Sequence, residues 1–305
     1  MKRLLLCLVL LAACIFGTRA FEWPLEDPTV TATFGEHRGD HFHSGVDLGG
    51  GEQPVFPIAN GELVYFYEEG SGPGLLPSGL GNYVVLQHQG GIRSLYSHLK
   101  GGSLAELQKS VTGKTRIGLV GESGYSAGKH LHLSIIDTEM GTVINPFLVL
   151  PPVSDKQIPT IKDVYVRRGR ELIRLADKPV LRRGEVEVLA SVYDVRPDVS
   201  FLWRMAPYKV YLYQDGREKV SLVFGSFHER RAGSRQTKES TFAPGTVSEL
   251  TLVGGEQSFQ AVYEDQWLFR LGFVTLTPGE TTLEVFAADF SGNESSREFQ
   301  IRVTE

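Results

Sequence analysis

Histidines in two separate segments offer the residue types of a metal site. His43 and Asp47 stand four residues apart in HSGVD, and His130 and His132 stand two apart in HLHLSI. If HLHLSI is a strand, His130, His132 and Ser134 share one face, because successive side chains of a strand alternate between its two faces. Three nitrogen and oxygen ligands, with the fourth position left to water, are typical of a catalytic zinc site. Zinc in such a site activates water and polarises a carbonyl, which is the chemistry of amide hydrolysis.

The remaining histidines differ in what their positions predict. Seven of the eight histidines lie in the first half of the chain, which indicates one site there. His98, in LYSHL, supplies a further imidazole that could act as a general base or stabilise an oxyanion. His41 shares an alternating face with His43 but matches no ligand position, so we expect it at the rim of the site at most. We expect His37 and His88 to be solvated.

The N-terminal segment has the pattern of a secretory signal. MKRLLLCLVLLAACIFGTRA combines a basic start, an apolar stretch and a small-residue ending at Ala20, so residues 1–20 are predicted to be removed on export. LAAC at 11–14 also resembles the lipobox of bacterial lipoproteins, so a lipid anchor at Cys14 competes with cleavage after Ala20. Cys7 and Cys14 are the only cysteines, which excludes a zinc finger, a catalytic thiol or a disulfide framework downstream.

Composition and charge exclude several classes of protein. The 305 residues are 41% hydrophobic and 22% charged, an ordinary globular composition, and the length suggests two domains. A formal net charge of -5 lacks the basic excess that phosphates require, so nucleic acid is not expected as a partner. No segment after the signal reaches the roughly 18–20 apolar residues of a membrane span. We therefore expect an exported protein of the periplasm or cell envelope without a transmembrane anchor, or a lipoprotein.

Short apolar runs separated by glycine-rich turns predict strands in the first half of the chain. These runs lie at 30–34, 62–67, 82–88, 92–99, 117–121 and 130–136. Residues 103–110 are the exception, because Ser103 and Glu106 form a capping box that predicts a short helix. Segment 69–81 is rich in glycine and proline, so we expect a loop that could rim a site.

A proline-bearing polar stretch, LPPVSDKQIPT, indicates a linker and divides the chain into domains at 21–152 and 153–305. About eight strand-like runs beyond it predict an immunoglobulin-like β-sandwich. These runs lie at 161–168, 186–194, 209–215, 220–227, 246–254, 267–274, 281–290 and 297–303. DFSGNES offers three oxygen-bearing side chains that could hold calcium, those of Asp289, Asn293 and Glu294, but their spacing is not that of a calcium loop, so a polar hairpin turn is expected there.

Several motifs together resemble the signature of a known family. HSGVD, YSHL and IGLVGESGYSAGKHLHLSI, followed by INPFLVL, are similar to the motifs of the lysostaphin-type (LytM-like) zinc metalloendopeptidases, which cleave peptidoglycan cross-links. The resemblance covers roughly residues 30–150 and keeps the motifs in the family's order. It implies a mainly β chain, in which an antiparallel LytM-like peptidase domain (duplicated hybrid motif) precedes the predicted immunoglobulin-like accessory domain.

The resemblance also implies a role for each site residue. By position, His43, Asp47 and His132 would bind Zn²⁺, and His98 and His130 would be catalytic. In that family the two catalytic histidines flank the attacked carbonyl as base and as stabiliser of the tetrahedral intermediate, and which does which stays open here. The implied substrate is a peptidoglycan stem peptide or cross-bridge, and the retention of all five positions argues for an active enzyme.

Two departures from the family's pattern leave other functions open. The helix predicted at 103–110 and the long loop at 69–81 could reshape or block the substrate groove. The alternative function is therefore a catalytically blocked regulator that binds the wall or activates an amidase, and a zinc peptidase acting on proteins is a third. The bond that is cut depends on groove shape rather than on the metal motif.

Overall fold

The chain is mainly β, as the sequence predicts. The computed structural model describes residues 21–36, 38, 42–70, 78–104, 107–197, 199, 203–228, 260–263 and 266–305. The predicted signal at 1–20, the run predicted at 246–254, and His37 and His41 lie outside the described residues. Within the described ranges the helical elements are two 3-10 turns, η1 (Gln89–Gly91) and η2 (Pro146–Leu148). A search of the same ranges finds no helix that is both long and apolar enough to cross a membrane.

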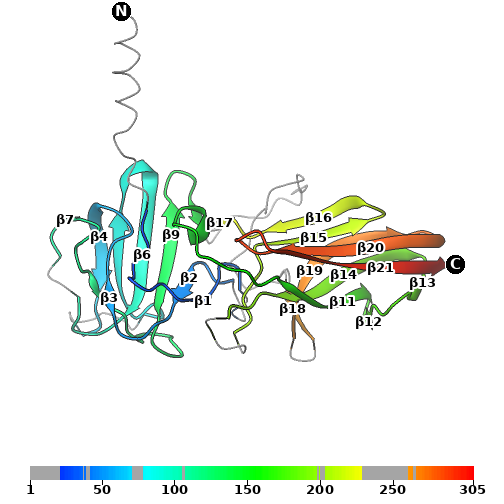
Figure 1. Ribbon diagram of the computed structural model, residues 1–305, viewed down its shortest axis with the longest axis horizontal. Helices are drawn as coiled ribbons and strands as arrows, with labels where there is room; N and C mark the ends of the chain where they lie inside the picture. Colours follow the sequence, from blue (N-terminus) through cyan, green and yellow to red (C-terminus); the bar gives the residue numbers. More distant parts are fainter. Residues whose placement is uncertain are drawn as a thin grey trace, which may run out of the picture.

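The first half of the chain forms an antiparallel sheet in the order β1-β2-β9-β6-β5-β4-β7, with β10 beside β9 and β17 beside β10 (Figure 1). Its strands are β1 (Val30–Ala32), β2 (Val46–Leu48), β4 (Gly61–Tyr67), β5 (Asn82–Gln87), β6 (Ile92–Leu99), β7 (Ser110–Val111), β9 (Leu131–Asp137), β10 (Thr142–Ile144) and β17 (Ser226–His228). A separate pair joins β3 (Pro54–Val55) to β8 (Gly118–Leu119).

Apolar and polar side chains alternate along β9, so its core residues and its polar candidate-site residues lie on opposite faces of the sheet. Leu131, Leu133 and Ile135 are fully buried in one hydrophobic cluster. His132 and Ser134 lie between them and therefore point to the opposite face of the sheet. The apolar residues thus fix the register that carries the two polar side chains to one side.

The second half of the chain is a sandwich of two five-stranded sheets, whose inward side chains form one hydrophobic cluster. One sheet has the order β12-β11-β14-β19-β18 and the other β13-β21-β20-β15-β16. The strands are β11 (Thr160–Arg168), β12 (Glu171–Arg174), β13 (Val180–Arg182), β14 (Gly184–Tyr193), β15 (Lys209–Gln214), β16 (Arg217–Val223), β18 (Gln260–Tyr263), β19 (Gln266–Leu276), β20 (Gly279–Ala288) and β21 (Glu294–Thr304). An immunoglobulin-like topology stays a prediction.

The two halves are joined by a shared ladder and a shared core. Strand β17, which follows β16 in the second half, pairs antiparallel with β10 of the first. On β17, the fully buried Phe227 stacks on Phe34, with ring centroids 4.0 Å apart. Phe34, Phe42 and Val143 belong to the same hydrophobic cluster as the sandwich interior. The second half therefore covers apolar surface that the first half presents near β1 and β10.

The helix predicted at 103–110 is wrong for the part that the structure describes. Ser103, Leu104 and residues 107–109 have no regular structure, β7 begins at Ser110, and Glu106 lies outside the described residues. The Ser103 hydroxyl donates to the Lys100 carbonyl at 2.6 Å and accepts from the backbone N–H of Leu119 at 3.1 Å. A tertiary contact with β8 thus takes the side chain that would have capped a helix.

The expectation that His88 is solvated is also wrong. His88 is buried at the end of β5, with Nδ1 3.0 Å from the Asn60 carbonyl oxygen and Nε2 2.7 Å from the Ser94 hydroxyl. Burial lowers the pKa of this imidazole. His88 therefore ties a loop to the core and takes no part in the site.

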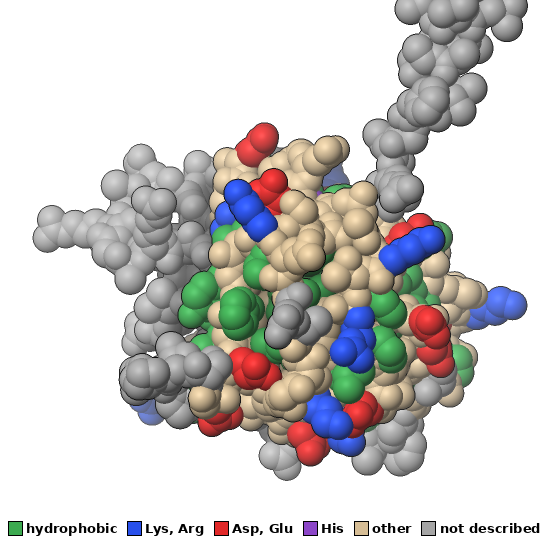
Figure 2. Space-filling view, turned by 90° about the vertical axis from the view of Figure 1, so that its left-hand side faces the viewer, with side chains coloured by type: hydrophobic (Ala, Val, Ile, Leu, Met, Phe, Trp, Pro, Cys, Tyr) green, Lys and Arg blue, Asp and Glu red, His purple; other side chains and the backbone are tan. Residues whose placement is uncertain are grey.

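The end of the molecule at which β4 and β7 lie presents interspersed acidic and basic side chains with hydrophobic ones between them (Figure 2). On β4, Val64, Tyr65 and Phe66 are 47%, 49% and 48% exposed. Phe66 pairs with Val84, whose side chain is in the core, so Phe66 lies on the face of the sheet opposite the polar side chains of β9. Phe66 is therefore separate from the candidate site.

Candidate metal centre

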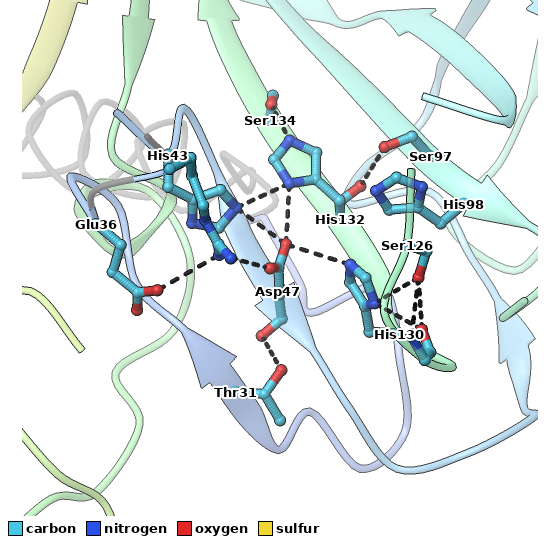
Figure 3. Close-up of polar contacts among 12 residues, drawn as sticks. Thr31, Glu36, His43, Asp47, Ser97, His98, Ser126, His130, His132 and Ser134 are labelled. Atoms are coloured by element: carbon cyan, nitrogen blue, oxygen red, sulfur yellow. Dashed lines mark hydrogen bonds and ion pairs between the residues drawn. The ribbon is translucent and has the colours of Figure 1, made fainter. Parts of the chain in front are cut away.

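Three side chains converge on one point beside β2 and β9 (Figure 3). His43 Nε2 lies 3.0 Å from Asp47 Oδ1 and 2.9 Å from His132 Nδ1, and the last two atoms are 2.9 Å apart. All three residues are buried. His132 is 85 residues from Asp47 in the sequence, and the antiparallel pairing of these two residues brings them together.

The partners of the outer nitrogens show what these three atoms can hold. His43 Nδ1 lies 2.8 Å from the Thr33 carbonyl, which can only accept, so Nδ1 carries the proton and Nε2 presents a lone pair. His132 Nε2 lies 2.8 Å from the Ser134 hydroxyl, whose oxygen can accept a hydrogen bond from a proton on Nε2. In that tautomer Nδ1 of His132 presents a lone pair. Two nitrogen lone pairs and a carboxylate oxygen then face one another. Such a donor set repels itself unless a cation lies among the three atoms, and it fits a divalent metal of the zinc type.

The backbone around HSGVD has no room for another side chain. A Cβ on Gly45 would lie 2.3 Å from the Leu133 carbonyl oxygen and 2.8 Å from the His132 ring. Glycine therefore lets the turn between His43 and Asp47 approach β9 closely enough for the three ligand atoms to meet.

Asp47 is held as an anion by its neighbours. Burial alone would raise the pKa of this carboxyl, but when protons rather than a metal ion lie among the three atoms, the charge and hydrogen bonds of His43 and His132 bring the pKa well below its usual range. Arg38 donates to the second oxygen, Oδ2, at 3.0 Å, so Oδ1 is the oxygen turned to the imidazoles. Arg38 also pairs with Glu36 at 3.4 Å. Burial raises the pKa of Glu36 to about 8, against the lowering influence of Arg38 and Thr33.

His98 lies at the end of β6 in an unusual backbone conformation. Its φ of 60° is in the left-handed region, which non-glycine residues adopt at a cost and often at functional sites. The backbone N–H of His98 donates to the Leu80 carbonyl at 2.9 Å, and the ring Nδ1 lies 2.8 Å from the Ser123 carbonyl. Nδ1 therefore carries the proton and Nε2 the lone pair. Burial lowers the pKa of His98 to about 4, so the imidazole is neutral near pH 7.

His130 stands beside His98 just before β9. The ring centroids of these two histidines are 4.7 Å apart. His130 Nδ1 lies 2.9 Å from the Gly128 carbonyl, which orients the ring, and Nε2 lies 3.8 Å from Asp47 Oδ1. Two oriented imidazoles therefore stand next to the three converging ligand atoms, where they can exchange protons with a bound molecule.

All five residues singled out in the sequence lie in this cluster. Sequence reasoning missed the groups that hold them: Arg38 on Asp47, Thr33 on His43 and Ser123 on His98. Thr33 and Ser123 make their contacts through a backbone carbonyl, which every residue has, so their side-chain types give no signal in the sequence.

The polar turn expected in DFSGNES is confirmed. Asp289 accepts from the backbone N–H of Asn293 at 2.8 Å, and the two residues also pair through their backbones.

Comparison with known proteins finds similarity to this part of the chain. Residues 41–146 match the model of Peptidase family M23. Among curated proteins, the DD-carboxypeptidase/endopeptidase Mpg of Neisseria meningitidis serogroup B is 33% identical over 114 residues, which are 37% of this chain and 24% of that protein. A metalloprotease of Haemophilus influenzae, named as uncharacterized, is 32% identical over 136 residues, 44% of this chain and 26% of that protein. The chain thus spans about a quarter of the length of these relatives.

Solved structures of the same kind also match. The catalytic domain of lysostaphin from Staphylococcus simulans is 25% identical, with a TM-score of 0.31, over 36% of this chain and 81% of that chain. A zinc-containing peptidase from Vibrio cholerae is 23% identical, with a TM-score of 0.35, over 42% of this chain and 39% of that chain.

Proposed function

We propose that the protein is an exported zinc metalloendopeptidase that hydrolyses peptide bonds of peptidoglycan stems or cross-bridges, since residues 41–146 match the model of Peptidase family M23. The observation that carries the proposal is the convergence of His43 Nε2, Asp47 Oδ1 and His132 Nδ1 within 3.0 Å of one another. The name of the Neisseria relative, a carboxypeptidase and endopeptidase, supports the reaction class.

The chain's own residues divide the chemistry among them. His43, Asp47 and His132 would hold the ion, which when bound polarises the scissile carbonyl and lowers the pKa of water to about 7. Nε2 of His98 or of His130 can accept the proton of the attacking water. The imidazolium formed in this way can return the proton to the leaving amine. The Ser123 and Gly128 carbonyls keep both rings in the required tautomer.

Isolated peptidoglycan sacculi provide the direct test. Purified protein of residues 21–305, zinc-loaded or treated with chelator, is incubated with sacculi, and released fragments are analysed by mass spectrometry. We expect chelator-sensitive release of peptides with new amino termini, whose masses identify the bond. Unfolded protein substrates, treated in parallel, test the peptidase that acts on proteins.

Failure to release peptides would have a definite meaning. A protein that holds one zinc per chain and cosediments with sacculi without cleaving them would be the wall-binding regulator instead. Cleavage that appears only after addition of a partner amidase would support the same alternative.

The export part of the proposal has its own test. The first 20 residues carry the signal pattern, and Cys14 stands in a lipobox-like LAAC. Mass spectrometry of the mature protein from an expressing cell distinguishes a chain that begins at Phe21 from a lipidated chain that begins at Cys14. An intact Met1 in a cytoplasmic fraction would contradict export.

A further inference from the structure

A tryptophan from the second half of the chain lies in the wall of the metal-site groove. The groove has a volume of about 630 Å³, and Asp47, His98, His130 and Trp203 are among its lining residues. Trp203 stands between β14 and β15, outside the M23 match, and is 47% exposed. A half-exposed indole in the wall of a concave site offers a large apolar ring to a bound molecule, and burial of that ring is favourable.

The segment that carries Trp203 is fixed on the first half of the chain. Met205, two residues on, is 1% exposed and belongs to the core cluster of the first sheet. Its backbone pairs with Asp194 at the end of β14. The Ala206 carbonyl accepts from the Thr33 hydroxyl at 3.0 Å. Trp203 is therefore anchored beside β1, at the edge of the strands that carry the ligands.

The other side of the groove is also apolar. Leu80 and Tyr125 line it and are 36% and 92% exposed. The Leu80 carbonyl accepts from the backbone N–H of His98, so this wall stands at β6, on the far side of β2 and β9 from β1. Two apolar walls thus flank the converging ligand atoms.

We propose that Trp203 is a specificity-determining residue that packs against an apolar side chain of the bound peptide, so that the second half of the chain forms part of the substrate site. The inference rests on the proposed function, since it assigns a contact within the same groove. A peptide is the occupant that the geometry favours, because a chain laid across the metal ligands between Leu80 and Trp203 would present its side chains to both walls.

Three variants test the contact. Trp203→Ala removes the ring and Trp203→Phe keeps an aromatic surface. Phe66→Ala is the matched control, because Phe66 is 48% exposed on the opposite face of the sheet. Each zinc-loaded protein is assayed for metal content, for kcat and KM on soluble stem peptides and on glycan-bearing muropeptides, and for muropeptide affinity by calorimetry.

Aromatic residues at the centre of an interface commonly contribute a tenfold or larger factor in affinity, so we expect Trp203→Ala to raise KM and the dissociation constant by about tenfold. The metal content and kcat of Trp203→Ala should stay near those of the intact protein. The KM and dissociation constant of Trp203→Phe should lie between those of Trp203→Ala and the intact protein, and those of Phe66→Ala should match the intact protein. A purely structural role would instead lower metal content or kcat.

The failures of the two proposals are distinguishable. If the intact protein releases peptides and Trp203→Ala has an unchanged KM on both substrates, the Trp203 contact is overturned while the peptidase stands. If KM rises only on glycan-bearing muropeptides, the ring packs on sugar and the assignment to a peptide side chain is overturned. If nothing is cleaved, the peptidase falls, and calorimetry decides the contact: a loss of muropeptide affinity confined to Trp203→Ala supports it, and equal or undetectable affinity overturns it.

Discussion

At the residue scale, the metal centre separates atoms that would bind an ion from atoms that would move protons. His43, Asp47 and His132 point their donor atoms at one another, whereas His98 and His130 are oriented by backbone carbonyls beside them. The two groups should therefore respond differently to truncation. A change in the first group removes a ligand, and a change in the second leaves the ligand set intact.

We expect His132→Ala to lose its metal, because the two ligands that remain, His43 and Asp47, bind zinc poorly. His98→Ala and His130→Ala should keep one zinc per chain and lose roughly 10²- to 10⁴-fold in turnover. Metal analysis by mass spectrometry beside the sacculus assay measures both quantities. A metal-free His98→Ala protein would show that the division into ligands and catalysts is wrong.

Arg38 gives a second prediction at this scale. Its guanidinium donates to Asp47 Oδ2 and so leaves Oδ1 for the ion. Arg38→Met should weaken metal binding by about 10- to 100-fold, which is the usual effect of losing a partner of a metal ligand. Competition with a fluorescent zinc chelator measures the affinity. Arg38→Lys keeps the charge but lacks the planar guanidinium, so its zinc affinity should lie between those of Arg38→Met and the intact protein. Equal zinc affinity in all three proteins would contradict the positioning role of Arg38.

At the element scale, local sequence patterns predicted those features of a strand that depend only on its own residues. The alternation of HLHLSII determines both the core face and the site face of β9, so the direction of His132 followed from its neighbours alone. The capping box at Ser103 failed because Leu119, distant in sequence, takes the same hydroxyl. No periodic pattern in the sequence marks the hydrogen bond from Arg38 to Asp47 or the stacking of Phe227 on Phe34. Each contact joins two segments that become neighbours only when the chain folds.

The turn before β5 supports the catalytic side of the centre and provides a test. Gly81 has a φ of +64°, and a Cβ there would lie 2.3 Å from the backbone carbon and Oγ of Ser123, whose carbonyl orients His98. Gly81→Ala should therefore displace Ser123, lower turnover while metal is retained, and cost about 1–3 kcal/mol of stability. Gly90→Ala is the control, because Gly90 has a similar φ of +70° with nothing near its Cβ. Equal activity in both variants would contradict the steric argument.

At the scale of the whole molecule, three carboxylates meet where the linker, β14 and the β20–β21 turn converge. Oxygens of Asp155, Asp194 and Asp289 lie within 4.8 Å of one another. Burial raises the pKa of Asp194 to about 7, and the two neighbouring acids add to the rise while the Val195 N–H and Arg196 oppose it. The fold therefore favours protonated Asp194, which makes the junction sensitive to pH.

The sign of this dependence follows from the two pKa values. An acid whose pKa rises from 3.8 to about 7 on folding stabilises the protein at low pH, and this stabilisation is lost progressively as the pH rises through about 7. The melting temperature of the intact protein should therefore fall relative to that of Asp194→Asn between about pH 4 and pH 7, then stay level. Calorimetry on both proteins isolates this residue, because Glu36 titrates in both. Parallel curves would show that Asp194 ionises normally.

The junction between the halves also affects the order in which the protein can be completed during synthesis. The loop that holds His43 through the Thr33 carbonyl is itself held by Ala206 and by Phe227, which stacks on Phe34. A ribosome makes those covering residues long after the loop. The nascent chain must therefore carry an uncovered Phe34 until β17 emerges and pairs with β10. We expect the metal centre to be complete only after the second half has folded, so a chain that is still being synthesised would lack the finished site.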